Sequence, residues 1–529
     1  MGYAAFSIFT VLCLLNSAGY SQNVGIGTNS PDASALLDIK SANKGLLIPR
    51  TSTTSRLLIS NPAKGLILYD TTTSSIWFFD ALEWKEINNS ANAWNIKGNV
   101  GINPDINFIG TNDNSPFRIK LNNLWAGELN SSAKNYSIGD SAGASLTSGI
   151  FNVAIGSKAL AKNNTGTRNT AIGHEVLKLN TTGEYNSGVG SFALASNVDG
   201  YSNTAMGVYA LHSNISGFEN TAIGTSALYS NVSSSYSTAV GSQALANSTG
   251  SRNTAVGTYA LNGNETGSTN TSVGYSSLQL NVNGSGNTAL GAYSLANNDT
   301  GKTNVAIGFA ALYYNISGNN NVAVGYRALF LNDGSVYNVA VGDSALYNNN
   351  SVEGNNTALG SKALYTNTSG YSNTAVGSSA LRANVSGWDN TAIGAAALYS
   401  NTGGIENTAT GRQALFYNAS GAGNTATGFK ALRENTTGYN NTAIGNYALT
   451  ANMIGWDNTG VGVTALYSNT TGTENTATGR QALFYNTIGS GNTATGYKAL
   501  RENTTAGENT AIGYGALFTQ SLVITAIPG

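Results

Sequence analysis

Small and apolar residues return at a fixed interval over most of the chain. From residue 135 to residue 518, the motif Asn-Thr-Ala-Ile-Gly or a close variant occurs 23 times, and we number each unit from its glycine as position 0. Successive glycines lie 17 residues apart, except once 16 and once 18. Position −2 is always Ala, Gly or Ser, position −1 is Ile, Val, Leu, Met or Thr, and position +4 is Leu in 22 of the 23 units. This period predicts an array in which each unit is one structural element.

The pattern inside a unit predicts two short strands and two turns. In an extended segment, positions −3 and −1 share one face, whereas −2 and the glycine share the other. We expect the β-branched residue at −1 to be buried with the Leu at +4, which starts a second apolar column. The small face at −2 and 0 indicates close approach of another backbone. Asn at +7 and Gly near +10 suit turns, so each unit is one coil of a parallel β-solenoid of about 23 coils.

A helical solenoid is the competing interpretation, and the composition argues against it. Seventeen residues are too few for a helix pair, and Asn, Gly and Thr are poor helix formers. Position −4 is Asn in 22 of 23 units and position +7 in 20 of 23. In stacked coils, these side chains would form hydrogen-bonded amide ladders along the axis, and we assign the asparagines this structural role.

The core of such a coil is thin, which predicts oligomerisation. One Ile or Val and one Leu contribute about 1.5–3 kcal/mol each when buried, whereas ordering each backbone residue costs roughly 1–2 kcal/mol. We therefore expect a homotrimer or another oligomer, with the all-small −2 face as the seam between chains.

The unit Asn152-Val153-Ala154-Ile155-Gly156, followed by Ala159-Leu160, resembles the head repeats of trimeric autotransporter adhesins of the YadA type. This resemblance covers residues 135–518 and implies a left-handed parallel β-roll, three chains wide, on a bacterial surface. The period of 17 is longer than the usual head repeat of that family. A coiled-coil stalk and a multi-stranded membrane anchor are not recognisable in the sequence.

The flanking regions differ from the repeat. Residues 1–21 read as a signal peptide, with an apolar run from Ala4 to Leu15 and cleavage near Ser21. Residues 22–134 contain four of the six Trp and five of the six Pro, and predict a β-rich module of short strands and turns. Its segments Val24–Thr28 and Gly45–Arg50 resemble exported surface proteins of the Bacteroidetes and phage tail-fibre modules. Residues 519–529 predict a C-terminal strand or cap.

No constellation of residues predicts catalysis, so we expect a protein that is not an enzyme and has no cofactor or metal. The only cysteine, Cys13, lies in the signal segment, and the two histidines, His174 and His212, occupy different columns of the repeat. The net charge is −1 and only 10% of residues are charged, so the sequence does not predict a basic surface that could bind nucleic acid. No stretch of the mature chain predicts a membrane-spanning helix.

Two columns suggest contacts. Aromatic residues recur at +5, where alternation from the buried Leu points them outward, so we take them as a candidate stripe for a protein or glycan, or as packing against neighbouring subunits. Its members are Tyr229, Tyr313, Tyr347, Tyr365, Tyr399, Phe416, Tyr467 and Phe484. Thr replaces the apolar residue at −1 in Thr410, Thr427, Thr478 and Thr495, whose hydroxyls should bond a backbone carbonyl or one another.

These observations lead us to expect a secreted or cell-surface fibrous protein, adhesin-like and self-associating, that attaches through many equivalent weak contacts. One alternative is a filament or sheath subunit that binds only itself. Another is an ice- or polysaccharide-binding solenoid that uses ladders of Thr and Asn.

Overall fold

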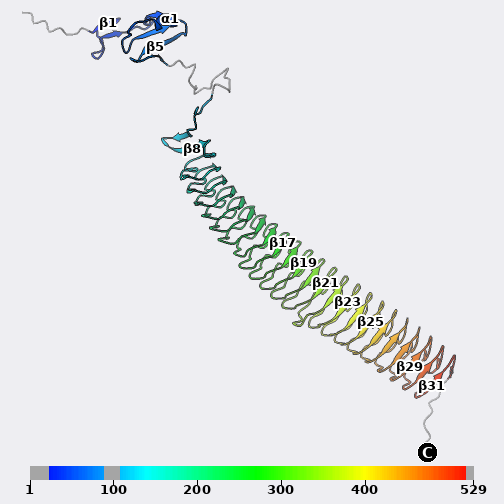
Figure 1. The fold of residues 1–529 in the computed structure, drawn as a ribbon. Helices are drawn as coiled ribbons and strands as arrows, with labels where there is room; N and C mark the ends of the chain where they lie inside the picture. Colours follow the sequence, from blue (N-terminus) through cyan, green and yellow to red (C-terminus); the bar gives the residue numbers. More distant parts are fainter. Residues whose placement is uncertain (1–22, 88–107, 520–529) are drawn as a thin grey trace, which may run out of the picture. The chain divides into compact units, whose positions relative to one another are not determined.

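The computed structural model of the chain describes residues 23–87 and 108–519. The chain divides into two compact units between Gly110 and Thr111. The expected signal peptide and most of the expected C-terminal strand lie outside the described residues. Figure 1 shows the stacked coils of the second unit, which run from cyan through green and yellow to red along the chain.

The first unit is a small β-rich module, as the sequence predicts. Its strands β1 (Val24–Ile26) and β2 (Leu37–Ile39) pair in parallel. A separate four-stranded sheet has the order β3-β4-β5-β6, parallel between β3 and β4 and antiparallel beyond. Its strands are β3 (Arg50–Thr51), β4 (Ile67–Asp70), β5 (Ser75–Phe79) and β6 (Trp84–Ile87). The short helix α1 (Thr53–Leu57) begins after Ser52, whose side chain accepts a hydrogen bond from the backbone N–H of Ser55.

A buried ion pair lies at the centre of this module. The Nε of Arg56 lies 2.8 Å from Oδ2 of Asp70, and both side chains are buried. The guanidinium carbon of Arg56 is 3.6 Å from the ring centre of Trp77, which is half-buried like Trp84. The aromatic residues therefore cover the ion pair from outside and do not form a core by themselves.

The buried carboxylate makes the module sensitive to acid. Burial alone raises the pKa of Asp70, but hydrogen bonds from Thr53, Arg56 and two backbone N–H groups outweigh it and lower the pKa from 3.8 to about 2. The folded module therefore binds this proton less readily than the unfolded chain. The stability that Asp70 contributes is complete above about pH 4 and is lost as the pH falls through about 2.

We predict that Asp70→Asn removes this pH dependence. The test is denaturant unfolding of the full chain at several pH values between 2 and 6, followed by tryptophan fluorescence. Between pH 2 and 4, the denaturant concentration at the unfolding midpoint should rise more for the wild type than for the variant. Other titrating carboxyls act in both chains and cancel in the difference. An identical pH profile for both chains would contradict the assignment.

The second unit is one continuous stack of strands. The antiparallel strands β7 (Phe117–Leu121) and β8 (Leu124–Asn130) begin it, and β8 pairs antiparallel with β9 (Asn135–Ile138). From β9 to β31, each strand then pairs in parallel with the next, and the register joins equivalent positions of successive units, such as Ala154 with Ala171. These 23 parallel strands confirm the predicted parallel β-solenoid of about 23 coils with 17-residue units.

Three-residue strands make up the rest of the ladder. They are β10 (Val153–Ile155), β11 (Thr170–Ile172), β12 (Ser187–Val189), β13 (Thr204–Met206), β14 (Thr221–Ile223), β15 (Thr238–Val240), β16 (Thr254–Val256), β17 (Thr271–Val273), β18 (Thr288–Leu290), β19 (Val305–Ile307), β20 (Val322–Val324), β21 (Val339–Val341), β22 (Thr357–Leu359), β23 (Thr374–Val376), β24 (Thr391–Ile393), β25 (Thr408–Thr410), β26 (Thr425–Thr427), β27 (Thr442–Ile444), β28 (Thr459–Val461), β29 (Thr476–Thr478), β30 (Thr493–Thr495) and β31 (Thr510–Ile512).

The first two strands of this unit fall within the segment that the sequence assigns to the N-terminal module, residues 22–134. The hairpin β7–β8 instead extends the sheet of the solenoid through β9, because its backbone groups pair with the first coil. The boundary between the compact units accordingly lies at residue 110.

Each coil contains one strand, not the two that the sequence predicts. The Leu at +4 does not start a second strand, because its backbone is left-handed in every coil, with φ near +50° at Leu160 and Leu177. A left-handed residue bends the chain and cannot continue an extended segment. Backbone hydrogen bonds still join the coils here, for example from the N–H of Leu160 to the carbonyl of Val176 at 3.0 Å.

The buried and exposed faces of the strand are reversed relative to the sequence prediction. Position −2 is fully buried, as at Ala171 and Ala222, and packs with the residues at +3 and +4. Position −1 points outward, and Ile155 keeps 42% of its surface exposed. The small residues at −2 therefore fill the narrow interior of the coil, and the predicted seam between chains on this face is wrong. The close approach that the repeated glycine makes is to the next coil of the same chain.

Two columns of asparagine run through the interior, as predicted. At −4, Nδ2 of Asn373 donates to the carbonyl of Gly387 (2.8 Å), while its Oδ1 accepts from the backbone N–H of Asn390 (3.1 Å). At +7, Nδ2 of Asn384 donates to Oδ1 of Asn367 at 2.7 Å. These buried amides join each coil to the next, which is the role of an amide ladder.

Candidate interaction surfaces

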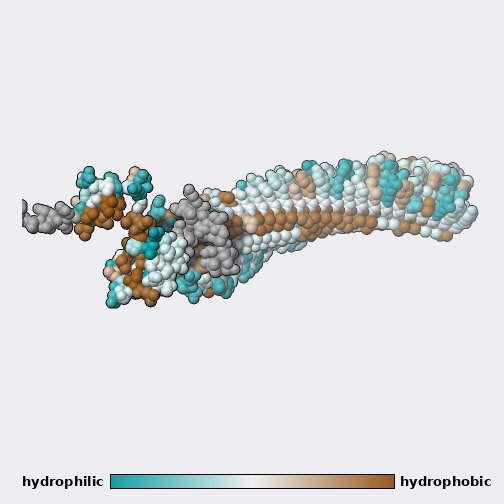
Figure 2. Space-filling model, turned by 90° about the horizontal axis from the view of Figure 1, so that it is seen from above, coloured by the Kyte–Doolittle hydropathy of each residue, from teal (hydrophilic) through white to brown (hydrophobic). Residues whose placement is uncertain are grey.

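The outward −1 column forms an apolar stripe along the solenoid, visible as the narrow brown line in Figure 2. It contains Ile, Val, Leu or Met in fifteen successive coils from Ile155 to Ile393. With strands about 4.8 Å apart, the 14 steps from β10 to β24, which carry these residues, span about 67 Å. A contiguous exposed apolar surface of this length marks an interaction site.

Threonine interrupts this stripe towards its C-terminal end. Thr410, Thr427, Thr478 and Thr495 share the outward face with the apolar members of the column. The sequence predicts that their hydroxyls bond a backbone carbonyl or one another. That prediction is wrong, because within residues 108–519 none of the four hydroxyls has a hydrogen-bond partner. Threonines of the +8 column behave differently, for example Thr436, whose Oγ1 donates to the carbonyl of Met453 at 2.9 Å.

The aromatic +5 column is also on the surface, where the structure stacks its rings from coil to coil. Tyr313, Phe330, Tyr347 and Tyr365 form four consecutive layers with ring centres 5.0–5.2 Å apart. The pairs Tyr399–Phe416 and Tyr467–Phe484 stack in the same way, and Tyr229 stacks on His212. Seven of the eight predicted stripe residues are half-buried and Tyr229 is exposed, because ring faces cover one another and leave mainly the edges open.

Arginine side chains also belong to this +5 column and pack on its rings. The sequence did not lead us to predict this role for them. Arg382 lies between the rings of Tyr365 and Tyr399, at 5.6 and 5.5 Å from their centres, and donates to the hydroxyl of Tyr399 at 2.7 Å. In the same column, Arg433 contacts the ring of Phe416 and Arg501 contacts the ring of Phe484, each in the preceding coil. A guanidinium on an aromatic face is stabilised by the ring quadrupole. The signal in the sequence was the recurrence of arginine, as well as of aromatic residues, at position +5.

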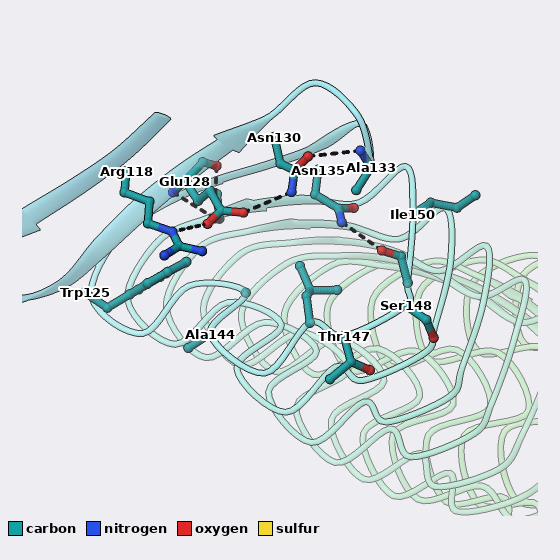
Figure 3. A pocket seen from close by; sticks show the side chains of 14 residues that line it. Arg118, Trp125, Glu128, Asn130, Ala133, Asn135, Ala144, Thr147, Ser148 and Ile150 are labelled. Atoms are coloured by element: carbon teal, nitrogen blue, oxygen red, sulfur yellow. Dashed lines mark hydrogen bonds and ion pairs between the residues drawn. The ribbon is translucent and has the colours of Figure 1, made fainter. Parts of the chain in front are cut away.

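A cavity of about 410 Å³ opens at the first coil, beside the hairpin β7–β8 (Figure 3). Arg118 pairs with Glu128 at 2.8 Å across its rim, and the indole N–H of Trp125 donates to the carbonyl of Ala142 at 2.8 Å. The polar groups at the rim thus have partners within the chain. They close the first coil of the ladder, as terminal units of repeat proteins commonly do.

The N-terminal module exposes large apolar side chains of its own. Leu47, Leu58 and Leu82 are 75%, 77% and 90% exposed.

The two histidines contact aromatic rings on the solenoid. Each belongs to a run of aromatic contacts in which the ring of His174 meets Phe192, Phe192 stacks on Tyr209, and Tyr209 meets His212. Burial lowers the pKa of His212. In the part of the chain that the structure describes, no group of three or more His, Cys, Asp or Glu could hold a metal ion. The described helix is too short to cross a bilayer.

Residues 25–100 match the family model of a phage tail-like trimerisation region. No curated protein and no solved structure matches the chain. The match supports self-association, and together with the β-solenoid it indicates a rod-like fibre protein.

Proposed function

We propose that the protein is an exported, homotrimeric cell-surface fibre whose solenoid, similar to YadA-type heads, attaches to other cells or to a matrix. Two observations together support this proposal. The solenoid has an apolar stripe at position −1, and the segment that precedes it in the sequence matches a trimerisation region. The trimerisation region brings three N-termini together, which requires the three solenoids to run in parallel. Their stripes then face one another, and burying them supplies the hydrophobic stabilisation that a thin single coil lacks.

The size of the stripe fits a stable interface. The uninterrupted apolar strip, about 67 Å long and about 10 Å wide, offers on the order of 700 Å² per chain, close to the value of about 800 Å² per partner in a standard interface. The proposed seam between chains therefore lies along the −1 column. This is the opposite face of the strand from the −2 column, where the sequence predicts the seam.

Attachment would come from the repeated outer columns. Stacked +5 rings present edges, tyrosine hydroxyls and interleaved arginines in successive coils, so they suit repeated polar contacts more than face-on stacking of sugars. Many weak equivalent contacts on a stiff rod multiply into strong avidity.

The association and the position of the seam are tested with cysteine variants in a Cys13→Ser background. We expect the full chain to have three times its single-chain mass in solution. Ile223→Cys, on the stripe, should form disulfide-linked dimers on oxidation, because equal positions meet at the axis. Val232→Cys, similarly exposed at +8, should not. A single-chain mass would overturn the association, and equal cross-linking of the two variants would overturn the seam.

Attachment is tested separately. Beads coated with the full chain should be retained on some members of a panel of glycans and matrix proteins, and retention should fall when the beads carry few copies. Failure to bind across the panel, with the trimer intact, would contradict the adhesin role and leave a structural fibre.

The filament alternative requires growth from end to end. The antiparallel hairpin β7–β8 closes the N-terminal end of the parallel ladder, which disfavours stacking of one solenoid on the next. Electron microscopy of the purified protein distinguishes the two, because single rods of one length support the fibre and long polymers support the filament.

A further inference from the structure

We propose that Thr410, Thr427, Thr478 and Thr495 fix the axial register in which the three chains pack along the −1 stripe. This inference rests on the trimeric association proposed above and assigns a role to residues that the attachment function does not use.

An apolar stripe alone specifies register weakly. From Ile155 to Ile393 the column offers Ile, Val, Leu or Met in every coil, so a chain that slides by one or two coils still places apolar groups opposite apolar groups. The trimerisation region ends near residue 100, hundreds of residues before the C-terminal coils, and equivalent coils along the ladder differ little.

The threonines break this uniformity in a fixed pattern. Two threonine coils, β25 and β26, are followed by two apolar coils, β27 and β28, and by two further threonine coils, β29 and β30. Their hydroxyls have no hydrogen-bond partner within residues 108–519, although threonines elsewhere on the same solenoid bond the next coil. They are therefore available to bond groups of another chain.

In a parallel, in-register trimer each threonine meets the same threonine of its neighbours, and the hydroxyls can pair. A slip of two coils places Thr410 and Thr427 opposite Ile444 and Val461, which buries hydroxyls against apolar groups without partners and costs free energy. A slip of four coils matches one pair of threonine coils but leaves the other pair opposite Val341 and Leu359 or beyond the last coil. A polar residue in an apolar seam can set register in this way at some cost in stability.

The test uses two reporter chains in a Cys13→Ser background, Ile393→Cys and Leu359→Cys, distinguished by a mass tag and co-expressed. The two positions are two coils apart in the column. A disulfide requires Cα atoms within about 7 Å, and two coils are displaced by about 10 Å. In-register packing therefore gives disulfides between equal positions, whereas a slipped register gives disulfides between Ile393→Cys and Leu359→Cys chains.

With the native threonines, we expect disulfides between equal positions to dominate. The variant Thr410→Val/Thr427→Val/Thr478→Val/Thr495→Val should lower the ratio of equal to offset disulfides by about tenfold. It should not lower the thermal midpoint, because valine already occupies this position in other coils, such as Val461.

The matched control replaces four exposed threonines of the +9 column, Thr182, Thr437, Thr471 and Thr505, with valine. The control should leave the disulfide ratio unchanged. An unchanged ratio in the −1 variant would overturn the register role while leaving the trimer in place. A complete lack of interchain disulfides in every background would overturn the seam itself, and this inference with it.

Discussion

Gly377→Ala should destabilise the solenoid by about 2–6 kcal/mol, the combined cost of a strained backbone and an overpacked site. Gly377 has a φ of +133°, a conformation that residues with a side chain rarely adopt. A Cβ here would lie 2.7 Å from the carbonyl carbon and oxygen of Gly394 in the next coil. The neighbouring atoms are backbone atoms of the ladder, so they cannot move aside without breaking the register.

Gly403→Ala is the matched control for this substitution. Its φ lies outside the left-handed region, and an added Cβ would contact only Ser386 Oγ at an ordinary 3.5 Å. We expect a change within about 1 kcal/mol, in the direction of greater stability, because alanine restricts the unfolded chain. Chemical denaturation followed by circular dichroism gives both values, and equal effects would contradict the tight coil-to-coil contact.

Asn373→Ala should destabilise the solenoid by about 1–3 kcal/mol, because it leaves one buried polar group, the backbone N–H of Asn390, without a partner. Asn373 is fully buried and exchanges hydrogen bonds with Asn356, Gly387 and Asn390. Removing the amide leaves the N–H of Asn390 without its acceptor, whereas the carbonyl of Gly387 keeps the amide of Asn384 as a donor at 2.9 Å.

The effect should be centred on the neighbouring coils, since each unit of a repeat protein contacts mainly the units beside it. Hydrogen exchange should therefore increase most around Asn356 and Asn390. Asn350→Ala, at an exposed asparagine of the same solenoid, serves as the control and should change stability by less than about 0.5 kcal/mol. Equal losses for the two substitutions would show that the asparagine ladder contributes little.

Much of the fold could be predicted because the repeat imposes the same environment on every unit. The 17-residue period, the parallel stacking and the two asparagine ladders follow from columns of identical residues, and the structure confirms them. The surface position of the +5 aromatics also followed from the sequence. The arginines between them were missed, because their type differs from that of the rings on which they pack.

The sequence by itself determined that positions −3 and −1 share one face of the strand and positions −2 and 0 the other, since alternation is a local property of extended backbone. Which face lies inside was decided only by the tertiary structure. A coil closed by left-handed residues at the Leu of +4 leaves interior room for that Leu, two asparagines and alanine, so Ala154 is buried and Ile155 is outside. Local alternation carries no information on the width of the coil, and that width turns the larger residues outward, where another chain can cover them.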